Sequence, residues 1–341
     1  MKNVKKVVAV ILALTMLFAV SACGGGDDKD SGKARVMKVA HWFNEDHPQH
    51  KSLEKFKTLM EEKTNGAIKV ELYPNSQLGS EDTYIDSVKQ GTVQMGATGT
   101  MIAKYLPKIY AAETPYLVSD WDTAKNVYTG DPAKILEKGF VEASGMKIAA
   151  ITVNGFREFS SNKKISSMAD FKGQRIRVPN VPNYIKMVEA LGATPITMSL
   201  TEVFTAMETD AVDGQDNPYP TVVTSSFYEV QKYELESRHM FSPMFWVMND
   251  SWYNGLSDDE KKAVDESVKE ASDYNWELSE DFDNESKATL KEKGMKINVP
   301  EDAFMKQMQD AMNPVYEWYF KEFEGSEEFI KAAWDLQGKK Y

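Results

Sequence analysis

Two arginines, Arg175 and Arg177, stand two residues apart in the segment RIRV. Because side chains alternate along a strand, both guanidinium groups are predicted to lie on one face and both aliphatic side chains on the other. Arg177 lies two residues before Pro179, at the carboxyl end of the strand, where ligands of open α/β sheets bind. A guanidinium holds a carboxylate through two parallel hydrogen bonds. These residues favour Arg177 as an anion-binding residue, with a structural ion pair as the alternative, and they place Arg175 at the surface or in a salt bridge.

Asn217 and Arg157 are two further polar candidates. Asn217 lies between an Asp-Gly pair and Pro218 in the segment DGQDNP, a context typical of a turn. Arg157 ends the segment NGFR, and a surface ion pair would explain it without a ligand. Taken alone, neither residue defines a binding site.

Four short patterns follow one another within residues 154–218: RVPN, EALGATP, SLTE at the start of a helix, and VDGQDNP. Their order and spacing resemble the ligand-anchoring core of the substrate-binding proteins of tripartite ATP-independent periplasmic (TRAP) transporters. The similarity extends, less densely, from about Val36 to the C-terminal helices. This family therefore supplies the most specific expectations for the chain.

The resemblance assigns roles to three residues. The family's carboxylate-binding arginine falls on Arg177, and the asparagine that hydrogen-bonds the same carboxylate falls on Asn217. Arg157 matches a second arginine, which contacts the ligand directly, through water or only in the closed state. Together these residues imply a ligand with a carboxylate.

The resemblance also implies ligand contacts from three loops of an N-terminal lobe. Here these loops contain His41 and Trp42, Glu81, and Thr100. Trp246 is a further candidate, because its ring would either stack on a sugar-like ligand or fill the core. No metal or cofactor is expected, since the histidines near Trp42 match no standard ligand spacing.

The N-terminus is typical of an exported lipoprotein. Three lysines precede an apolar run over residues 7–20, which is too short to span a bilayer comfortably. Small residues then precede Cys23, the only cysteine in the chain, and the arrangement resembles a lipobox. We expect residues 1–22 to be a signal peptide, Cys23 to carry lipid, and residues 23–34 to be a flexible tether. The alternative is an ordinary cleaved signal with an incidental cysteine.

The composition limits the choice of partners. Hydrophobic residues make up 42% of the 341 residues, enough for two lobes with their own cores. Removing the signal removes three lysines and no acids, which takes the formal charge from −12 to −15. So negative a chain argues against nucleic acid as a partner, and an anionic ligand would need local positive charge within a cleft.

Alternating strands and helices predict an α/β fold. The first βαβαβ unit has apolar or alternating strand segments at residues 36–41, 68–72 and 93–98, and a second unit follows with segments at 147–152, 175–178 and 195–197. Capping-box pairs open helices at Ser199 with Glu202 and at Ser257 with Glu260. The second of these helices is predicted to continue as far as Gly294.

We therefore predict a two-lobed, periplasmic-binding-protein-like α/β fold, with a ligand cleft between the lobes and a long helix spanning both. Lobe I is expected to comprise residues 35–154 plus about 243–282, and lobe II residues 155–242 plus about 283–341.

The predicted function is extracytoplasmic solute binding without catalysis. The protein would capture a small organic acid, either a sugar acid such as a uronate or aldonate or a C4-dicarboxylate, and deliver it to the small and large membrane subunits of a TRAP permease. Sialic acid is not expected, because an acidic residue near Gly99 and an asparagine near Trp42, which sialic-acid-binding members carry, are missing. The alternatives are an exported lipoprotein enzyme acting on acidic carbohydrate and a ligand-sensing lipoprotein.

Overall fold

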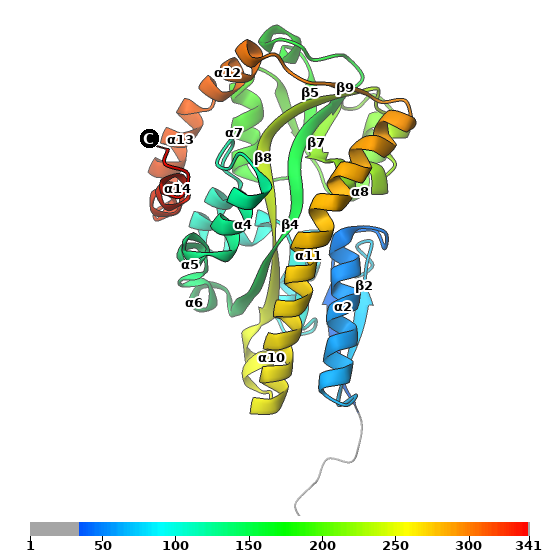
Figure 1. Cartoon of the computed structure of the whole chain (residues 1–341), viewed down its shortest axis with the longest axis vertical. Coiled ribbons are helices and arrows are strands. Elements are labelled where there is room, and N and C mark those ends of the chain that lie inside the picture. The colour runs from blue at the N-terminus through cyan, green and yellow to red at the C-terminus, as the bar shows by residue number, and fades with distance from the viewer. Residues whose placement is uncertain (1–33, 340–341) are drawn as a thin grey trace, which may run out of the picture. The chain divides into compact units, whose positions relative to one another are not determined.

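The computed structural model describes residues 34–339 and builds them around one mixed sheet (Figure 1). The strand order is β2-β1-β3-β8-β4-β7-β5-β6, and β9 pairs with β8 outside this path. The strands are β1 (Arg35–Ala40), β2 (Ile68–Tyr73), β3 (Met95–Thr98), β4 (Met146–Ser161), β5 (Arg175–Val178), β6 (Thr194–Thr197), β7 (Gly214–Pro218), β8 (Tyr233–Asn249) and β9 (Lys296–Asn298).

Helices cover this sheet. The α-helices are α2 (Pro48–Lys63), α3 (Glu81–Lys89), α4 (Trp121–Thr129), α5 (Asp131–Glu137), α6 (Phe140–Ser144), α7 (Pro182–Ala190), α8 (Leu200–Glu208), α9 (Tyr219–Thr224), α10 (Asp250–Asn254), α11 (Asp258–Glu292), α12 (Asp302–Asp310), α13 (Asn313–Glu322) and α14 (Ser326–Asp335). Four short 3-10 helices are η1 (Thr100–Lys104), η2 (Pro107–Glu113), η3 (Met168–Phe171) and η4 (Phe227–Glu229).

The first βαβαβ unit is confirmed. Strand β1 is parallel to β2 on one side and to β3 on the other. Alternate residues of β1 are buried, and they pack with Leu53, Phe56 and Met60 of α2 in one apolar cluster. The 3.6-residue period of α2 therefore matches the two-residue period of the strands that it covers.

The second predicted unit is confirmed only for residues 175–178 and 195–197, because residues 147–152 lie in β4, which pairs antiparallel with β7 and β8. The segment predicted at 175–178 forms β5, parallel to β6 and β7. Helix α7 buries Tyr184, Met187 and Val188. Helix α8 begins with the predicted capping box, in which the Glu202 carboxylate accepts from the Ser199 N–H at 3.0 Å.

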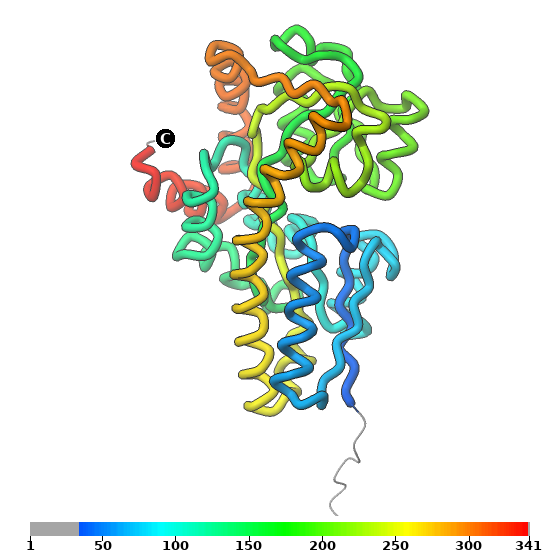
Figure 2. Tube along the Cα trace, turned by 45° about the vertical axis from the view of Figure 1, so that its right-hand side comes forward, coloured from blue at the N-terminus to red at the C-terminus, as the bar shows by residue number. Residues whose placement is uncertain are grey.

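Two long antiparallel strands, β4 and β8, join the units. They have 16 and 17 residues. The last part of β8 pairs with β3, where Met95 faces Met248, and the last part of β4 pairs with β7, where Arg157 faces Pro218. Figure 2 shows the N-terminal strands in blue and the β5–β7 region in green at opposite ends of this pair. The sequence predicted only residues 147–152 of β4.

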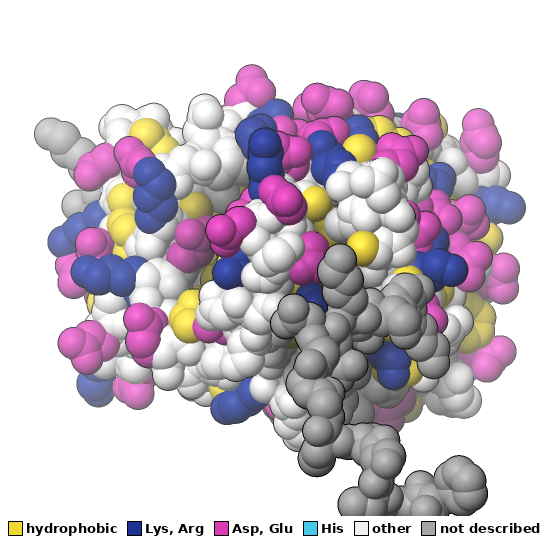
Figure 3. Space-filling model, turned by 90° about the horizontal axis from the view of Figure 1, so that it is seen from below, with side chains coloured by type: hydrophobic (Ala, Val, Ile, Leu, Met, Phe, Trp, Pro, Cys, Tyr) yellow, Lys and Arg dark blue, Asp and Glu magenta, His cyan; other side chains and the backbone are white. Residues whose placement is uncertain are grey.

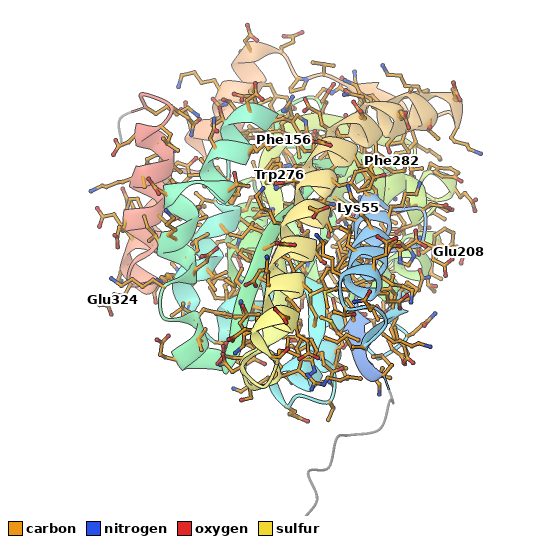
Figure 4. The ribbon with its side chains drawn as sticks, turned by 60° about the horizontal axis from the view of Figure 1, so that its bottom comes forward. Lys55, Phe156, Glu208, Trp276, Phe282 and Glu324 are labelled. Atoms are coloured by element: carbon orange, nitrogen blue, oxygen red, sulfur yellow. The ribbon has the colours of Figure 1, made fainter. Side chains whose placement is uncertain are left out.

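Helix α11 is the predicted long helix. It has 35 residues, starts with the capping box of Ser257 and Glu260, and ends just before Gly294, whose φ of +95° suits glycine. It packs against α2, β4 and α9, so it contacts elements from both units. Figure 4 shows Trp276 on its β4 side and Phe282 on the side of α2.

Charges of both signs cover the surface. On the face that Figure 3 shows, Asp and Glu side chains lie among Lys and Arg side chains, and neither sign forms a continuous patch. The net negative charge of the chain is therefore spread over this face.

Candidate ligand-binding site

A cavity of about 330 Å³ contains most of the predicted site residues. Its volume lies at the small end of the range for small-molecule sites, roughly 300–1,000 Å³. The polar and aromatic residues that line it come from both units: Trp42, Ser76, Ser80, Glu81, Asp82, Thr100, Glu113, Arg157, Arg177, Asn180, Tyr184, Thr197, Ser199, Thr201, Asn217 and Ser242. Of the eight predicted ligand-binding residues, six line this cavity and two do not.

Arg177 lies at the carboxyl end of β5 and is 3% exposed. Its Nε and one terminal nitrogen donate to the carbonyl oxygen of Met198, at 3.1 and 2.6 Å. Burial lowers the pKa of Arg177 to about 10, although Asp216 opposes this effect, so the side chain is still charged at neutral pH. Among the described residues no acidic side chain forms an ion pair with Arg177.

Arg175, in contrast, has an acidic partner. It is half-buried, and its Nε and a terminal nitrogen donate to the two carboxylate oxygens of Asp213, at 3.0 and 3.1 Å. The predicted salt bridge is thus present, outside the cavity.

Arg157 comes from the middle of β4 and is tied to β7. Its Nε donates to Asp216 Oδ2 at 2.7 Å, a terminal nitrogen donates to the Asp216 carbonyl at 2.5 Å, and the other donates to Ser242 Oγ at 3.4 Å. Burial alone would lower the pKa of Arg157, but the charge and hydrogen bond of Asp216, together with Tyr184 and Glu113, outweigh burial and raise that pKa. Arg157 and Asp216 therefore form a buried pair that is neutral overall.

Asn217 lies on β7, next to β5. Arg177 faces Gln215 in the parallel register, so Asn217, two residues further along, points to the same face of the sheet. Its side-chain amide donates to Gln215 Oε1 at 2.5 Å. The pairing of β5 with β7 thus brings Arg177 and Asn217 to one wall of the cavity.

Glu81 and Thr100 line the cavity from the first unit. Glu81 begins α3, and its Oε1 accepts from Thr98 Oγ1 at 2.6 Å and from the Gly99 N–H at 2.7 Å. Burial raises the pKa of Glu81, and the nearby Asp82 and Glu113 add to that rise. Thr100, at the start of η1, donates to Glu113 Oε2.

Glu113 is a lining residue that the sequence analysis missed. It is 2% exposed, and its Oε1 accepts from Tyr184 Oη at 2.5 Å and from Ser242 Oγ at 3.1 Å. One signal existed: Glu113 is a lone acid within the otherwise uncharged segment IYAAETPYLV, and an acid in such a segment is buried with partners or functional.

Trp42 lines the cavity, half-buried, and stacks on Phe43 with ring centroids 3.7 Å apart. Trp246 does not line it: its side chain is fully buried, and its indole N–H donates to Gln49 Oε1 at 3.0 Å. Of the two roles weighed for Trp246, the structure places it in the core.

His41 also lies away from the cavity lining. It is fully buried, and its Nε2 lies 3.1 Å from His50 Nδ1. Of the two residues predicted from the loop after β1, only Trp42 lines the cavity.

Residues 34–339 contain neither a candidate membrane-spanning helix nor a candidate metal-binding cluster. None of the helices there is both long enough and apolar enough to cross a membrane. No group of three or more His, Cys, Asp or Glu side chains in that range is arranged to hold a metal ion.

The fold and this cavity define a two-lobed α/β binding protein with a polar cleft between its lobes. The model of the DctP family, described as bacterial extracellular solute-binding protein, family 7, matches residues 39–322. The chain belongs to this family, and the predicted TRAP substrate-binding class is confirmed.

Three relatives illustrate the similarity. A TRAP periplasmic solute-binding protein from Haemophilus influenzae, solved with bound L-gulonate, is 34% identical with a TM-score of 0.85, covering 88% of this chain and 99% of that one. The 2,3-diketo-L-gulonate-binding periplasmic protein of Escherichia coli is 30% identical over 89% of this chain and 93% of its own. The C4-dicarboxylate-binding periplasmic protein of Rhodobacter capsulatus is 31% identical over 76% of this chain and 78% of its own.

Proposed function

We propose that the protein binds a small organic acid in this cavity and delivers it to the small and large membrane subunits of a TRAP permease. The single observation that carries the proposal is Arg177, a buried cation without an acidic partner among the described residues. Burying an unpaired charge is costly, so a site that retains one is suited to an anionic ligand.

The donors that remain on Arg177 fit a carboxylate. A guanidinium has five N–H donors, and the Met198 carbonyl uses two of them. Three donors at the far end of the fork remain, enough for a bidentate grip. Asn217 would add its free amide hydrogen, and Arg157 would contact the ligand from β4. Glu81, Thr100 and Trp42 would meet the rest of the molecule from the first unit.

One of the three relatives was solved with bound L-gulonate, and another is named for binding 2,3-diketo-L-gulonate; both compounds are sugar acids. We infer that the ligand of this chain is also a sugar acid, such as an aldonate or uronate. The third relative binds C4-dicarboxylates, and such ligands are the runner-up. No reaction is assigned to the cavity.

We further propose that the chain is a lipoprotein anchored at Cys23 outside the cytoplasmic membrane. The signal peptide, Cys23 and the tether up to residue 33 lie outside the described residues, so the support is the N-terminal sequence alone. We also propose lobe boundaries at residues 154–155, about 242–243 and about 282–283, and these come from the sequence analysis. They fall within β4, β8 and α11, the elements that contact both units.

A thermal-shift screen over organic acids tests the proposed function. A ligand at 100 times its Kd stabilises the folded state by about 2.7 kcal/mol, which raises the melting temperature measurably. We expect a sugar acid to give the largest shift. No shift with any aldonate, uronate or C4-dicarboxylate at millimolar concentration would refute organic-acid binding.

A further inference from the structure

The charged residues of the cavity are segregated by element. The arginines come from β4 and β5, whereas the acidic lining residues come from α3 and η2: Glu81, Asp82 and Glu113. A ligand held by a carboxylate at Arg177 therefore meets acidic groups where it contacts α3 and η2.

Of the described residues that line the cavity, one cation is free for a ligand. Arg157 is neutralised by Asp216, with 2.7 Å between Nε and Oδ2, whereas Arg177 contacts only a carbonyl oxygen among the described residues. A second carboxylate on the same ligand would find no uncompensated positive charge there. This arrangement balances one negative charge.

Within residues 34–339, the carboxylate of Glu113 accepts hydrogen bonds from hydroxyl groups only. Its side-chain donors are Thr100, Tyr184 and Ser242, which use three of the roughly four lone-pair sites of a carboxylate. Arg157 donates to Ser242 Oγ at 3.4 Å and Ser242 donates to Glu113 Oε1 at 3.1 Å, so one hydroxyl group bridges the two side chains. Burial raises the pKa of Glu113, and the charge of Arg157 opposes that rise. The remaining acceptor site on Oε2 suits one more hydroxyl.

Glu81 has the same acceptor chemistry. Thr98 and Gly99 both donate to Oε1, and among the described residues no donor reaches Oε2. Burial raises the pKa of Glu81, and Glu113 contributes to that rise, which means that the two acids already repel each other. A further carboxylate beside them would add to this repulsion.

We propose that Glu113 and Glu81 form an acidic subsite that accepts the hydroxyls of a polyhydroxy monocarboxylate and excludes a second carboxylate. The proposal rests on carboxylate binding at Arg177 and narrows the ligand to aldonates and uronates, against aldarates and C4-dicarboxylates. Glu113 is thereby a specificity-determining residue. Placing like charges together is unfavourable, so the site should discriminate against a second carboxylate by roughly tenfold or more.

Calorimetry with galactonate and galactarate tests the subsite, because the two ligands differ only in a terminal hydroxymethyl group against a terminal carboxylate. We expect the wild-type protein to prefer galactonate by roughly tenfold or more. Glu113→Gln should tighten galactarate binding and reduce this preference by roughly tenfold. The three hydroxyl partners of Glu113 can rotate to accept from the new amide, so the fold is expected to be retained.

Glu81→Gln is the second variant, and it should also improve galactarate binding. Asp86→Asn is the control: Asp86 lies on the same helix and pairs with Lys104 at 3.0 Å, but it does not line the cavity, so the preference should not change. Equal binding of galactonate and galactarate by the wild type would overturn the subsite. Tighter binding of an ammonium-bearing carboxylate than of galactonate would also overturn it, because the acids would then select a cation and not hydroxyl groups. If the wild-type protein bound none of these acids, the proposed function itself would be refuted, and not the subsite alone.

Discussion

At the scale of single residues, the site combines one free cation with paired charges. Arg177 contacts a backbone carbonyl, whereas Arg157 and Arg175 are each held by an aspartate, Asp216 and Asp213. Arg157 is thus fixed in orientation but largely neutralised, and Arg177 keeps its charge for a ligand. This difference could not be read from the sequence, since all three arginines carry the same formal charge.

Asp283 on α11 should make stability depend on pH. Burial raises the pKa of Asp283 from 3.8 to about 7, although Arg238 opposes the rise, and its Oδ1 has no hydrogen-bond partner among the described residues. The folded chain therefore holds this proton more tightly than the unfolded chain, and stability falls as the pH rises from about 4 to about 7.

Asp283→Asn should remove this loss. The melting temperature of the variant should exceed that of the wild type more at pH 8 than at pH 5. Asp281→Asn, on the exposed side of the same helix, is the matched control and should change little. The same difference at both pH values would show that Asp283 is not the titrating group.

At the scale of elements, the pairing of β5, β7 and β4 creates the wall of the cavity that we propose to bind an anion. The close approach of β7 to β4 explains why the VDGQDNP segment has glycine at position 214. A Cβ on Gly214 would lie 2.1 Å from the carbonyl oxygen of Ser160 and 3.2 Å from the Ser161 Cα. Both contacts are with the backbone of β4, so only glycine lets β7 approach that closely.

Gly214→Ala should therefore destabilise the protein severely, by about 3 kcal/mol or more, because the backbone of β4 or β7 must shift. Urea denaturation gives the loss directly. Gly192→Ala is the comparison: no atom lies within 4 Å of its added Cβ, and its φ of +88° adds strain alone. A smaller loss at Gly214 than at Gly192 would contradict the close approach.

At the scale of the whole molecule, alternation and capping pairs in the sequence predict most of the strands and helices, but they do not predict how these elements pack together. Strand β5, the parallel units and α11 followed from alternation and capping pairs. Strand β4 did not, because residues 151–161 are buried on both faces and show no alternation. Glu113 was missed because its partners Tyr184 and Ser242 are 71 and 129 residues away in the sequence. Such contacts exist only after both units pack together.

Ligand binding should close the two lobes. One contact between them is the hydrogen bond that Thr221 Oγ1 of α9 donates to Asn154 Oδ1 of β4 at 3.2 Å, near the β4 and α11 segments that continue through both lobes. An anion that touches both walls would draw them together. Small-angle scattering should show a smaller radius of gyration with saturating ligand. An unchanged radius would mean that binding needs no closure.

Cys23→Ser should abolish lipid attachment, because the chain has no other cysteine. Metabolic labelling with a fatty acid should mark the wild-type protein and not the variant, which should be released or remain unprocessed. Undiminished label on Cys23→Ser would exclude Cys23 as the lipidated residue.

The central claim is that Arg177 binds a carboxylate by its geometry and not by its charge alone. Calorimetry of Arg177→Lys and Arg175→Lys with a bound sugar acid tests it most directly. Lysine keeps the charge but loses the planar fork, so Arg177→Lys should weaken binding by roughly 30- to 1,000-fold, about 2–4 kcal/mol, with the melting temperature of the ligand-free protein little changed. Arg175→Lys, outside the cavity, should bind nearly as the wild type does. Equal, small losses in both variants would contradict the claim and remove Arg177 from the site.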